Sequence, residues 1–365
     1  MENLSDEIVD YLLNLIEIPS YKYPEGPNKA MKYINETLAK ESVQTSLLES
    51  GGLKNLVIEV GQGSQRVVIN THLDVVPESE NSRCKGTVKD GKVYGRGAAD
   101  AKAAAAVMMS LIIKLLKNEI ALTKKAIFEF VCDEEVSGEN GTGALVSKYP
   151  AEWCIFGEPM DGNRICYGSK AIFSQKLTFH GVPGHGSRPW EGKNAIFCAA
   201  KFITNLTSHK LFNYETLGKE AATVTPSIIR GGTKINQIPE LCELKVDVRR
   251  PAIVSEEEIL VAFEESMKDI DCEIQKETTS RVPPVYTDPN SELVQTLVKE
   301  TEKVVGEKPV LYIATGSSDA VFYAPTGAQV VEFGPRGKNW HGPEEYVEIQ
   351  GLLDWYNIIY NLLTT

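Results

Sequence analysis

The chain has 365 residues, of which 42% are hydrophobic and 24% are charged, and its formal net charge is -12. This length and composition are typical of a globular protein large enough for two domains. The negative charge argues against nucleic acid or an anionic membrane surface as the main partner.

The first residues are acidic and lack the basic and apolar regions of a signal peptide, so we expect a cytoplasmic protein. No stretch reaches the roughly 18 apolar residues that a membrane-spanning helix needs. The seven cysteines are scattered, odd in number and without a Cys-x-x-Cys pair. That pattern predicts reduced thiols rather than a disulfide framework or a thiolate zinc site.

Short apolar runs and helical patterns alternate along the first 160 residues, as is typical of an α/β protein. The apolar runs are bounded by turn-forming residues, and the helical patterns repeat every three to four residues. The sequence therefore predicts helices over 5–18, 28–39 and 103–116, and strands over 56–60, 66–70, 127–132 and 152–156.

The stretch from Ile127 to Gly138 begins as a buried strand and ends in Asp133, Glu134 and Glu135. Three carboxylates at one strand end repel one another unless a positive charge lies among them. A metal ion would compensate that charge. An acidic turn that faces water is the simpler interpretation of this stretch on its own.

Other predicted strands also end in polar residues. His72 and Asp74 share a face of extended chain after the strand at 66–70, so one can bind a metal while the other orients it. A surface pair is the alternative. Asp100 precedes the helix at 103–116, and Glu158 and His341 follow later strands. Two histidines and several carboxylates suit zinc, cobalt or manganese, and the converging loops could hold two ions that share a carboxylate.

The chain changes character from Ala171. A strand-helix-strand-strand-helix-strand order follows, which is the ferredoxin-like pattern. We therefore expect a catalytic domain with a central mixed sheet flanked by helices, formed by residues 1–169 and 282–365, and an inserted α+β domain of residues 170–281. The inserted elements are predicted over 172–179, 194–208, 222–230, 242–248, 256–269 and 272–277, and the later ones over 292–305, 309–312, 319–323, 329–333 and 350–363.

Five sequence blocks in this order resemble the co-catalytic zinc aminoacyl hydrolases. That family includes acetylornithine deacetylase, succinyl-diaminopimelate desuccinylase, aminoacylase and carboxypeptidase G. The resemblance covers nearly the whole chain and implies a homodimer in which the inserted domain is both lid and dimerisation domain. The blocks are residues 71–77, 95–102, 133–135, 157–159 and the segment around His341.

The resemblance also implies a role for each residue of the blocks. Asp100 bridges two divalent metal ions per subunit, which we expect to be zinc, with cobalt or manganese as possible substitutes. His72 and Glu158 bind one ion, and Glu135 and His341 bind the other. Glu134 is the general base, and Asp74 orients His72.

Further roles fall outside the metal blocks. His185, in a Gly-His segment, is implied to polarise the scissile carbonyl. We expect it to act on the partner subunit, and action within its own chain is the alternative. Asn236 and Arg249 are implied to bind the substrate carboxylate, although an ion pair with Asp247 is the alternative for Arg249. The backbone of Gly316, Ser317 and Ser318 is implied to hold a carboxylate as well.

These features predict a metal-dependent amidohydrolase that cleaves a small N-acyl amino acid, of the acetylornithine deacetylase or succinyl-diaminopimelate desuccinylase type. Glu158 favours this branch because the family's peptidases mostly have Asp at that position. A dipeptidase or carboxypeptidase with the same metals, acting on a short peptide, is the nearest alternative. An inactive metal-binding interaction protein is a more remote one, and the presence of Glu134 argues against it.

Overall fold

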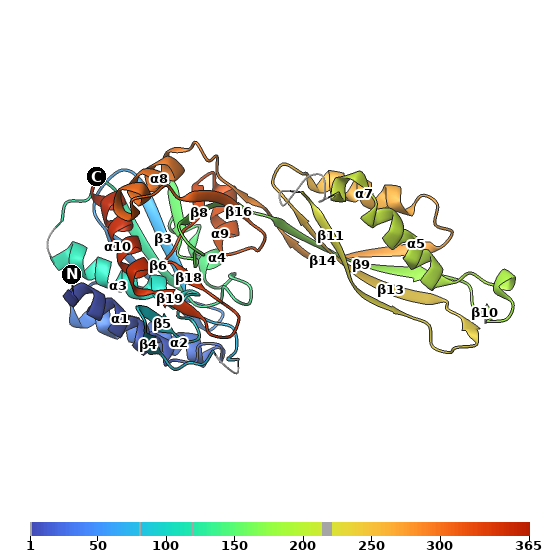
Figure 1. Ribbon diagram of the computed structural model, residues 1–365, viewed down its shortest axis with the longest axis horizontal. Coiled ribbons are helices and arrows are strands. Elements are labelled where there is room, and N and C mark those ends of the chain that lie inside the picture. The colour runs from blue at the N-terminus through green and yellow to red at the C-terminus, as the bar shows by residue number, and fades with distance from the viewer. Residues whose placement is uncertain (1, 80–81, 118–119, 214–220) are drawn as a thin grey trace. The chain divides into compact units, whose positions relative to one another are not determined.

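Figure 1 shows the computed structural model, which describes residues 2–79, 82–117, 120–213 and 221–365. The chain forms two compact units. The main unit comprises Met1–Gly168, Tyr286–Tyr312 and Ser318–Thr365, and the inserted unit comprises Ser169–Val285 and Ile313–Ser317. Among the described residues, no helix is both long enough and apolar enough to span a membrane.

The main unit is built on a nine-stranded mixed sheet, with the order β1-β2-β6-β3-β7-β17-β8-β15 and with β16 paired to β8. Its four central strands run parallel to one another. They are buried on both faces and mostly apolar, as strands covered by helices on both sides tend to be. The central strands are β6 (Lys125–Val131), β3 (Arg66–His72), β7 (Trp153–Phe156) and β17 (Gln329–Glu332), and the outer ones are β1 (Ser46–Ser50), β2 (Leu53–Val60), β8 (Arg164–Ser169), β15 (Val285–Tyr286) and β16 (Val310–Ala314).

The core helix of the main unit is α3 (Lys102–Lys117), and nearly all its residues are buried. Its alanines, leucines and methionines are strong helix formers, and a helix that is apolar all round belongs in a protein interior. It packs against β3, α1 (Glu2–Ile16) and α10 (Ile349–Thr364). The remaining helices of the unit are α2 (Glu25–Lys40), α4 (Thr142–Leu145), α8 (Glu292–Val305) and α9 (Ala320–Tyr323).

A second, four-stranded sheet in the main unit has the order β18-β19-β5-β4. Its strands cannot be predicted from the sequence, because two or three residues are too few to show an alternating pattern. Asp100 follows β5 of this small sheet, whereas His72 and Glu134 lie at the ends of strands of the large sheet. The strands are β4 (Thr87–Lys89), β5 (Lys92–Tyr94), β18 (Gly337–Lys338) and β19 (Tyr346–Glu348).

The inserted unit has an antiparallel sheet of order β11-β13-β9-β14, with α5 and α7 packed on it (Figure 1). Strand order and connections together confirm the ferredoxin-like prediction. Alternate residues of β9 are buried, and they join aromatic side chains of both helices in one core. The elements are β9 (Ala171–His180), α5 (Ala195–Thr207), β11 (Thr223–Gly231), β13 (Leu241–Arg250), α7 (Glu256–Met267) and β14 (Glu273–Val282), with β10 (Gly184–His185) paired to β12 (Gln237–Ile238).

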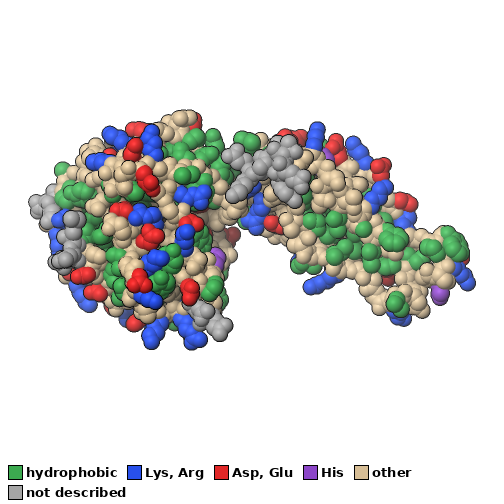
Figure 2. All heavy atoms as spheres, viewed as in Figure 1, with side chains coloured by type: hydrophobic (Ala, Val, Ile, Leu, Met, Phe, Trp, Pro, Cys, Tyr) green, Lys and Arg blue, Asp and Glu red, His purple; other side chains and the backbone are tan. Residues whose placement is uncertain are grey.

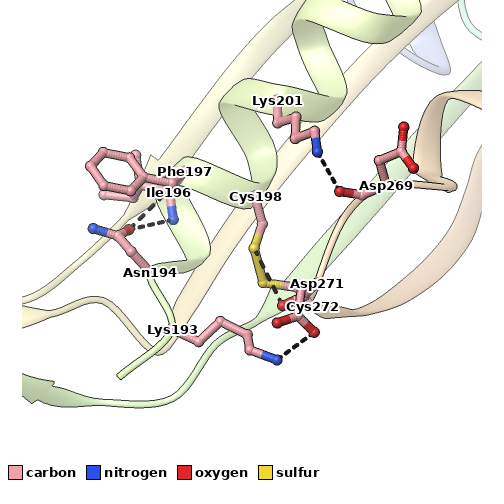
Figure 3. The surroundings of a disulfide bond; sticks show 9 residues. All are labelled: Lys193, Asn194, Ile196, Phe197, Cys198, Lys201, Asp269, Asp271 and Cys272. Atoms are coloured by element: carbon pink, nitrogen blue, oxygen red, sulfur yellow. Dashed lines mark hydrogen bonds and ion pairs between the residues drawn. A yellow bond between two sulfur atoms is a disulfide. The ribbon is translucent and has the colours of Figure 1, made fainter. Parts of the chain in front are cut away.

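The inserted unit also contains a disulfide between Cys198 on α5 and Cys272 beside β14 (Figure 3). The prediction that all cysteines are reduced is therefore wrong for this pair. The two cysteines lie 74 residues apart in sequence and meet only because α5 packs on the sheet, so their spacing carries no local signal. An ion pair between Lys193 and Asp271, at 2.7 Å, joins the same two segments.

Candidate metal centre

Three parallel strands deliver polar side chains to one edge of the large sheet. His72 is the last residue of β3, Glu134 and Glu135 follow β6, and Glu158 follows β7. Because β3 lies between β6 and β7, these three strand ends are neighbours. The carboxyl edge of parallel strands is the usual place for a functional site in an open α/β sheet.

Asp100 and His341 reach the same place from loops. The Nε2 atom of His72 lies 3.0 Å from Oδ1 of Asp100, and the Nε2 atom of His341 lies 3.1 Å from Oδ2. His341 takes a left-handed backbone conformation, with φ 62°, in the turn after β18. Each oxygen of the Asp100 carboxylate therefore faces a different histidine.

Two further carboxylates complete two groups of three. Nε2 of His341 lies 3.1 Å from Oε1 of Glu135, and Nε2 of His72 lies 3.9 Å from Oε2 of Glu158. Within each group the potential ligand atoms lie within 4.8 Å of one another. The structure thus forms two triads that share Asp100, with the same members that the sequence analysis groups together.

The electrostatics of the site favour the binding of a cation. Burial raises the pKa of the Glu134 and Glu158 carboxyls well above their usual range, and the negative charges of Asp100 and Asp319 add to the effect. A divalent ion would allow these acids to ionise in a buried place. Imidazole nitrogens with carboxylate oxygens suit zinc, cobalt or manganese, so the residues of both triads fit the metal that the sequence implies.

Asp74 is fully buried and does more than contact His72. Its carboxylate accepts hydrogen bonds from the backbone amides of Glu134, at 3.2 Å, and Glu135, at 2.8 Å, and from the hydroxyl of Tyr23. The Nδ1 atom of His72 lies 3.0 Å from the backbone oxygen of Asp74 and 3.6 Å from its Oδ1. Asp74 therefore holds the loop after β6 as well as the histidine.

Three residues around the site are not singled out by the sequence analysis. Tyr23 has no motif to mark it, because it reaches Asp74 from the segment between α1 and α2. Arg96 and Glu345 form a buried ion pair against the backbone of Asp100. Both residues lie inside blocks that carry the family resemblance. A charged residue in an otherwise apolar or glycine-rich stretch was the signal that could have identified them.

The predicted residues of the inserted unit divide between the two ends of its sheet. His185 pairs with Gln237, and the amide of Gly186 donates to the backbone oxygen of Asn236 at 2.8 Å, so His185 and Asn236 are exposed neighbours. Arg249 lies at the other end of β13, eight residues beyond Leu241, or about 26 Å along an extended strand. Asn236 and Arg249 of one chain are therefore not brought together.

Two of the residues that are predicted to bind a substrate carboxylate contact other side chains of this chain. Nε of Arg249 donates to Oδ2 of Asp247 at 2.9 Å, which is the ion pair that the sequence leaves open. The hydroxyl of Ser318 donates to Oε1 of Glu332 at 2.6 Å. Gly316 and Ser317 belong to the inserted unit and Ser318 to the main unit, and the helix that follows, α9, is only four residues long.

Comparison with known proteins agrees with this geometry. The model of peptidase family M20/M25/M40 matches residues 68–365. Succinyl-diaminopimelate desuccinylase of Rickettsia felis is 27% identical over 97% of this chain and 98% of its own length. The structure of an aminopeptidase from Bacillus cereus superimposes with a TM-score of 0.83 and 20% identity, over 99% of this chain and 98% of that one.

A third similar protein is described as a dinuclear metal-binding peptidase of this family. It comes from Bacillus subtilis, with a TM-score of 0.74 and 15% identity over 99% of this chain and 98% of that one. The family match covers most of the chain, and the two triads supply what a metal-dependent hydrolase needs. The chain therefore belongs to peptidase family M20/M25/M40 and is a metal-dependent hydrolase of amide or peptide bonds.

Proposed function

We propose that the protein cleaves the amide bond of an N-acyl amino acid, in the manner of succinyl-diaminopimelate desuccinylase or acetylornithine deacetylase, and so serves amino-acid biosynthesis. One observation carries the proposal: two triads share Asp100 beside Glu134, in a chain similar to a curated desuccinylase over 97% of its length. Glu158, where the family's peptidases mostly have Asp, supports the deacylase branch.

The proposed cofactors are two zinc ions per subunit, for which cobalt or manganese can substitute. His72, Asp100 and Glu158 would hold one ion, and Asp100, Glu135 and His341 the other. When bound, the ions would supply a polarised carbonyl and a water of lowered pKa.

Glu134 is proposed as the general base. Its pKa is raised by burial, and a carboxylate with a raised pKa accepts a proton more readily. Glu134 would take a proton from the attacking water and pass it to the leaving amine. The hydrogen bond from the Glu134 amide to Asp74 fixes the backbone of this base.

A homodimer in which His185 acts on the partner's substrate is proposed as well. Among the described residues, β11 is an edge strand of its sheet, and Figure 2 shows hydrophobic side chains on the surface of the inserted unit. Phe197 is 72% exposed and Ile229 is 50% exposed. Ala171, where the chain enters the unit, pairs with Arg250 beside Arg249, whereas His185 and Asn236 lie at the far end of the sheet. Delivery to a partner is supported because Arg249 would then meet an Asn236 of the other chain.

Mixing two inactive variants tests this arrangement. Subunits with His185→Ala and subunits with Glu134→Ala are unfolded together and refolded. Half of the randomly formed dimers are mixed, and each mixed dimer has one complete site if His185 acts on the partner, so about a quarter of the parental activity should return. Activity that stays at background would show that His185 acts within its own chain.

A peptidase is the second candidate function, since an aminopeptidase is among the structures most similar to this fold. We propose to assay the metal-loaded enzyme on N-succinyl, N-acetyl and N-formyl amino acids beside dipeptides and tripeptides. Preference for a peptide would overturn the deacylase proposal and leave the metal chemistry intact. If the metal-loaded enzyme hydrolyses neither class of substrate, the alternative of an inactive interaction protein would be favoured.

Variants of two nearby glutamates test the chemistry itself. Glu134→Gln should lower kcat by about 10²–10⁴-fold while the enzyme keeps its metal, because a positioned base is lost. Glu139→Gln is the control, since Glu139 is exposed on the same loop. Loss of metal from Glu134→Gln would make Glu134 a ligand and refute its role as base.

A further inference from the structure

A buried glutamate lies directly behind the shared carboxylate of the two triads. Oε1 of Glu345 accepts hydrogen bonds from the backbone amides of Ala99, at 3.0 Å, and Asp100, at 3.1 Å. Its Oε2 pairs with Nη1 of Arg96 at 2.5 Å. Arg96 and Glu345 are 1% and 0% exposed, so this pair is shielded from water on both sides.

The same pair also ties the two loops that carry metal-binding candidates to each other. Glu345 follows His341 by four residues, and its backbone oxygen accepts from the amide of Gly95 at 3.1 Å. Nη2 of Arg96 lies 3.5 Å from the backbone oxygen of His341. One salt bridge and its hydrogen bonds therefore fix the position of the 95–100 loop relative to the 341–345 loop.

Stability alone does not explain a buried salt bridge, because an apolar pair of similar volume is often as stable. A further acid beside Asp100 also adds negative charge to an acidic site, and Arg96 offsets that charge. The pair instead restricts the backbone of Asp100, because two consecutive amides donate hydrogen bonds to one carboxylate oxygen. The two oxygens of Asp100 can face His72 and His341 together only from such a fixed backbone.

We propose that Glu345, held by Arg96, is a positioning residue that sets Asp100 to bridge the two metal ions. Glu345 is itself in neither triad, so it acts through the backbone of Asp100 and not as a ligand. The inference rests on the two-metal site of the proposed function. It predicts that the pair controls the affinity for metal, and above all for the ion that His341 and Asp100 share.

Metal binding is the direct test. Metal-free wild-type, Glu345→Gln and Glu344→Gln proteins are titrated with zinc and with cobalt by calorimetry, and the cobalt spectrum is recorded. Glutamine keeps one oxygen for the two amides, but its NH₂ group then faces Arg96 in place of an acceptor. The ion pair that holds this side chain in place is therefore lost. We expect at least one site of Glu345→Gln to bind about 10–100-fold more weakly. Glu344→Gln, the exposed neighbour, should match the wild type.

A second variant separates positioning from folding. Replacing Arg96 and Glu345 together by methionine removes both charges, and its unfolding free energy should exceed that of Glu345→Gln. Its metal affinity should be low as well, because no oxygen remains there to accept hydrogen bonds from the amides of Ala99 and Asp100. Wild-type affinity in either variant would overturn the inference while the two-metal site stands. A wild-type protein that binds no metal would overturn both the inference and the proposed function.

Discussion

Removal of the disulfide between Cys198 and Cys272 should destabilise the inserted unit. The bond closes a loop of 74 residues, and the chain-entropy expression gives about 4.5 kcal/mol for a loop of that length. Measured values more often lie at about 2–4 kcal/mol. We expect a loss in this range for Cys198→Ala, because the bond restricts the unfolded chain whatever the surrounding contacts contribute.

The assay compares Cys198→Ala, Cys272→Ala and the double variant by urea unfolding without reductant. If the bond is the source of the stability, each single variant loses as much as the double variant. Alkylation of the unfolded wild type without reductant should label five cysteines, namely Cys84, Cys132, Cys154, Cys166 and Cys242. Seven labelled cysteines, or losses that add up in the double variant, would refute the reasoning.

Three other changes test single contacts. Tyr23→Phe removes a hydroxyl that donates to buried Asp74, so the unfolding free energy should fall by about 1.5–3 kcal/mol, whereas Tyr21→Phe, at an exposed contact, should change little in the same urea titration. Burial raises the pKa of Glu129 from 4.5 to about 7, so the native state holds this proton more tightly than the unfolded chain, and the contribution to stability is lost as the pH rises through 7. Glu129→Gln should remove that slope, worth about 3 kcal/mol at most, between urea titrations at pH 5 and pH 8, and an unchanged slope would contradict it. Arg249→Lys should raise KM about tenfold or more for free α-carboxylate substrates and less for amidated ones, while an equal loss on both would make the arginine structural.

The sequence by itself predicted the fold class, and the resemblance of its five blocks to a known family implied the members of both triads. Apolar runs over β3, β6 and β7 are local patterns, and each one leads within a few residues to His72, Glu134 or Glu158. The order of strands and helices after Ala171 likewise predicts the ferredoxin-like sheet that the structure has. Such features can be predicted because hydrophobic periodicity is set by neighbouring residues.

The tertiary structure alone decided how distant segments meet. Asp100 lies beside a small sheet whose strands are too short to predict, and its amide donates to Glu345, 245 residues away. The same holds for the contact of Tyr23 with Asp74, for the disulfide across 74 residues, and for the placement of Asn236 and Arg249 at opposite ends of the inserted sheet. None of these contacts has a local signal, because each forms only when the fold closes and brings together side chains that the sequence keeps apart.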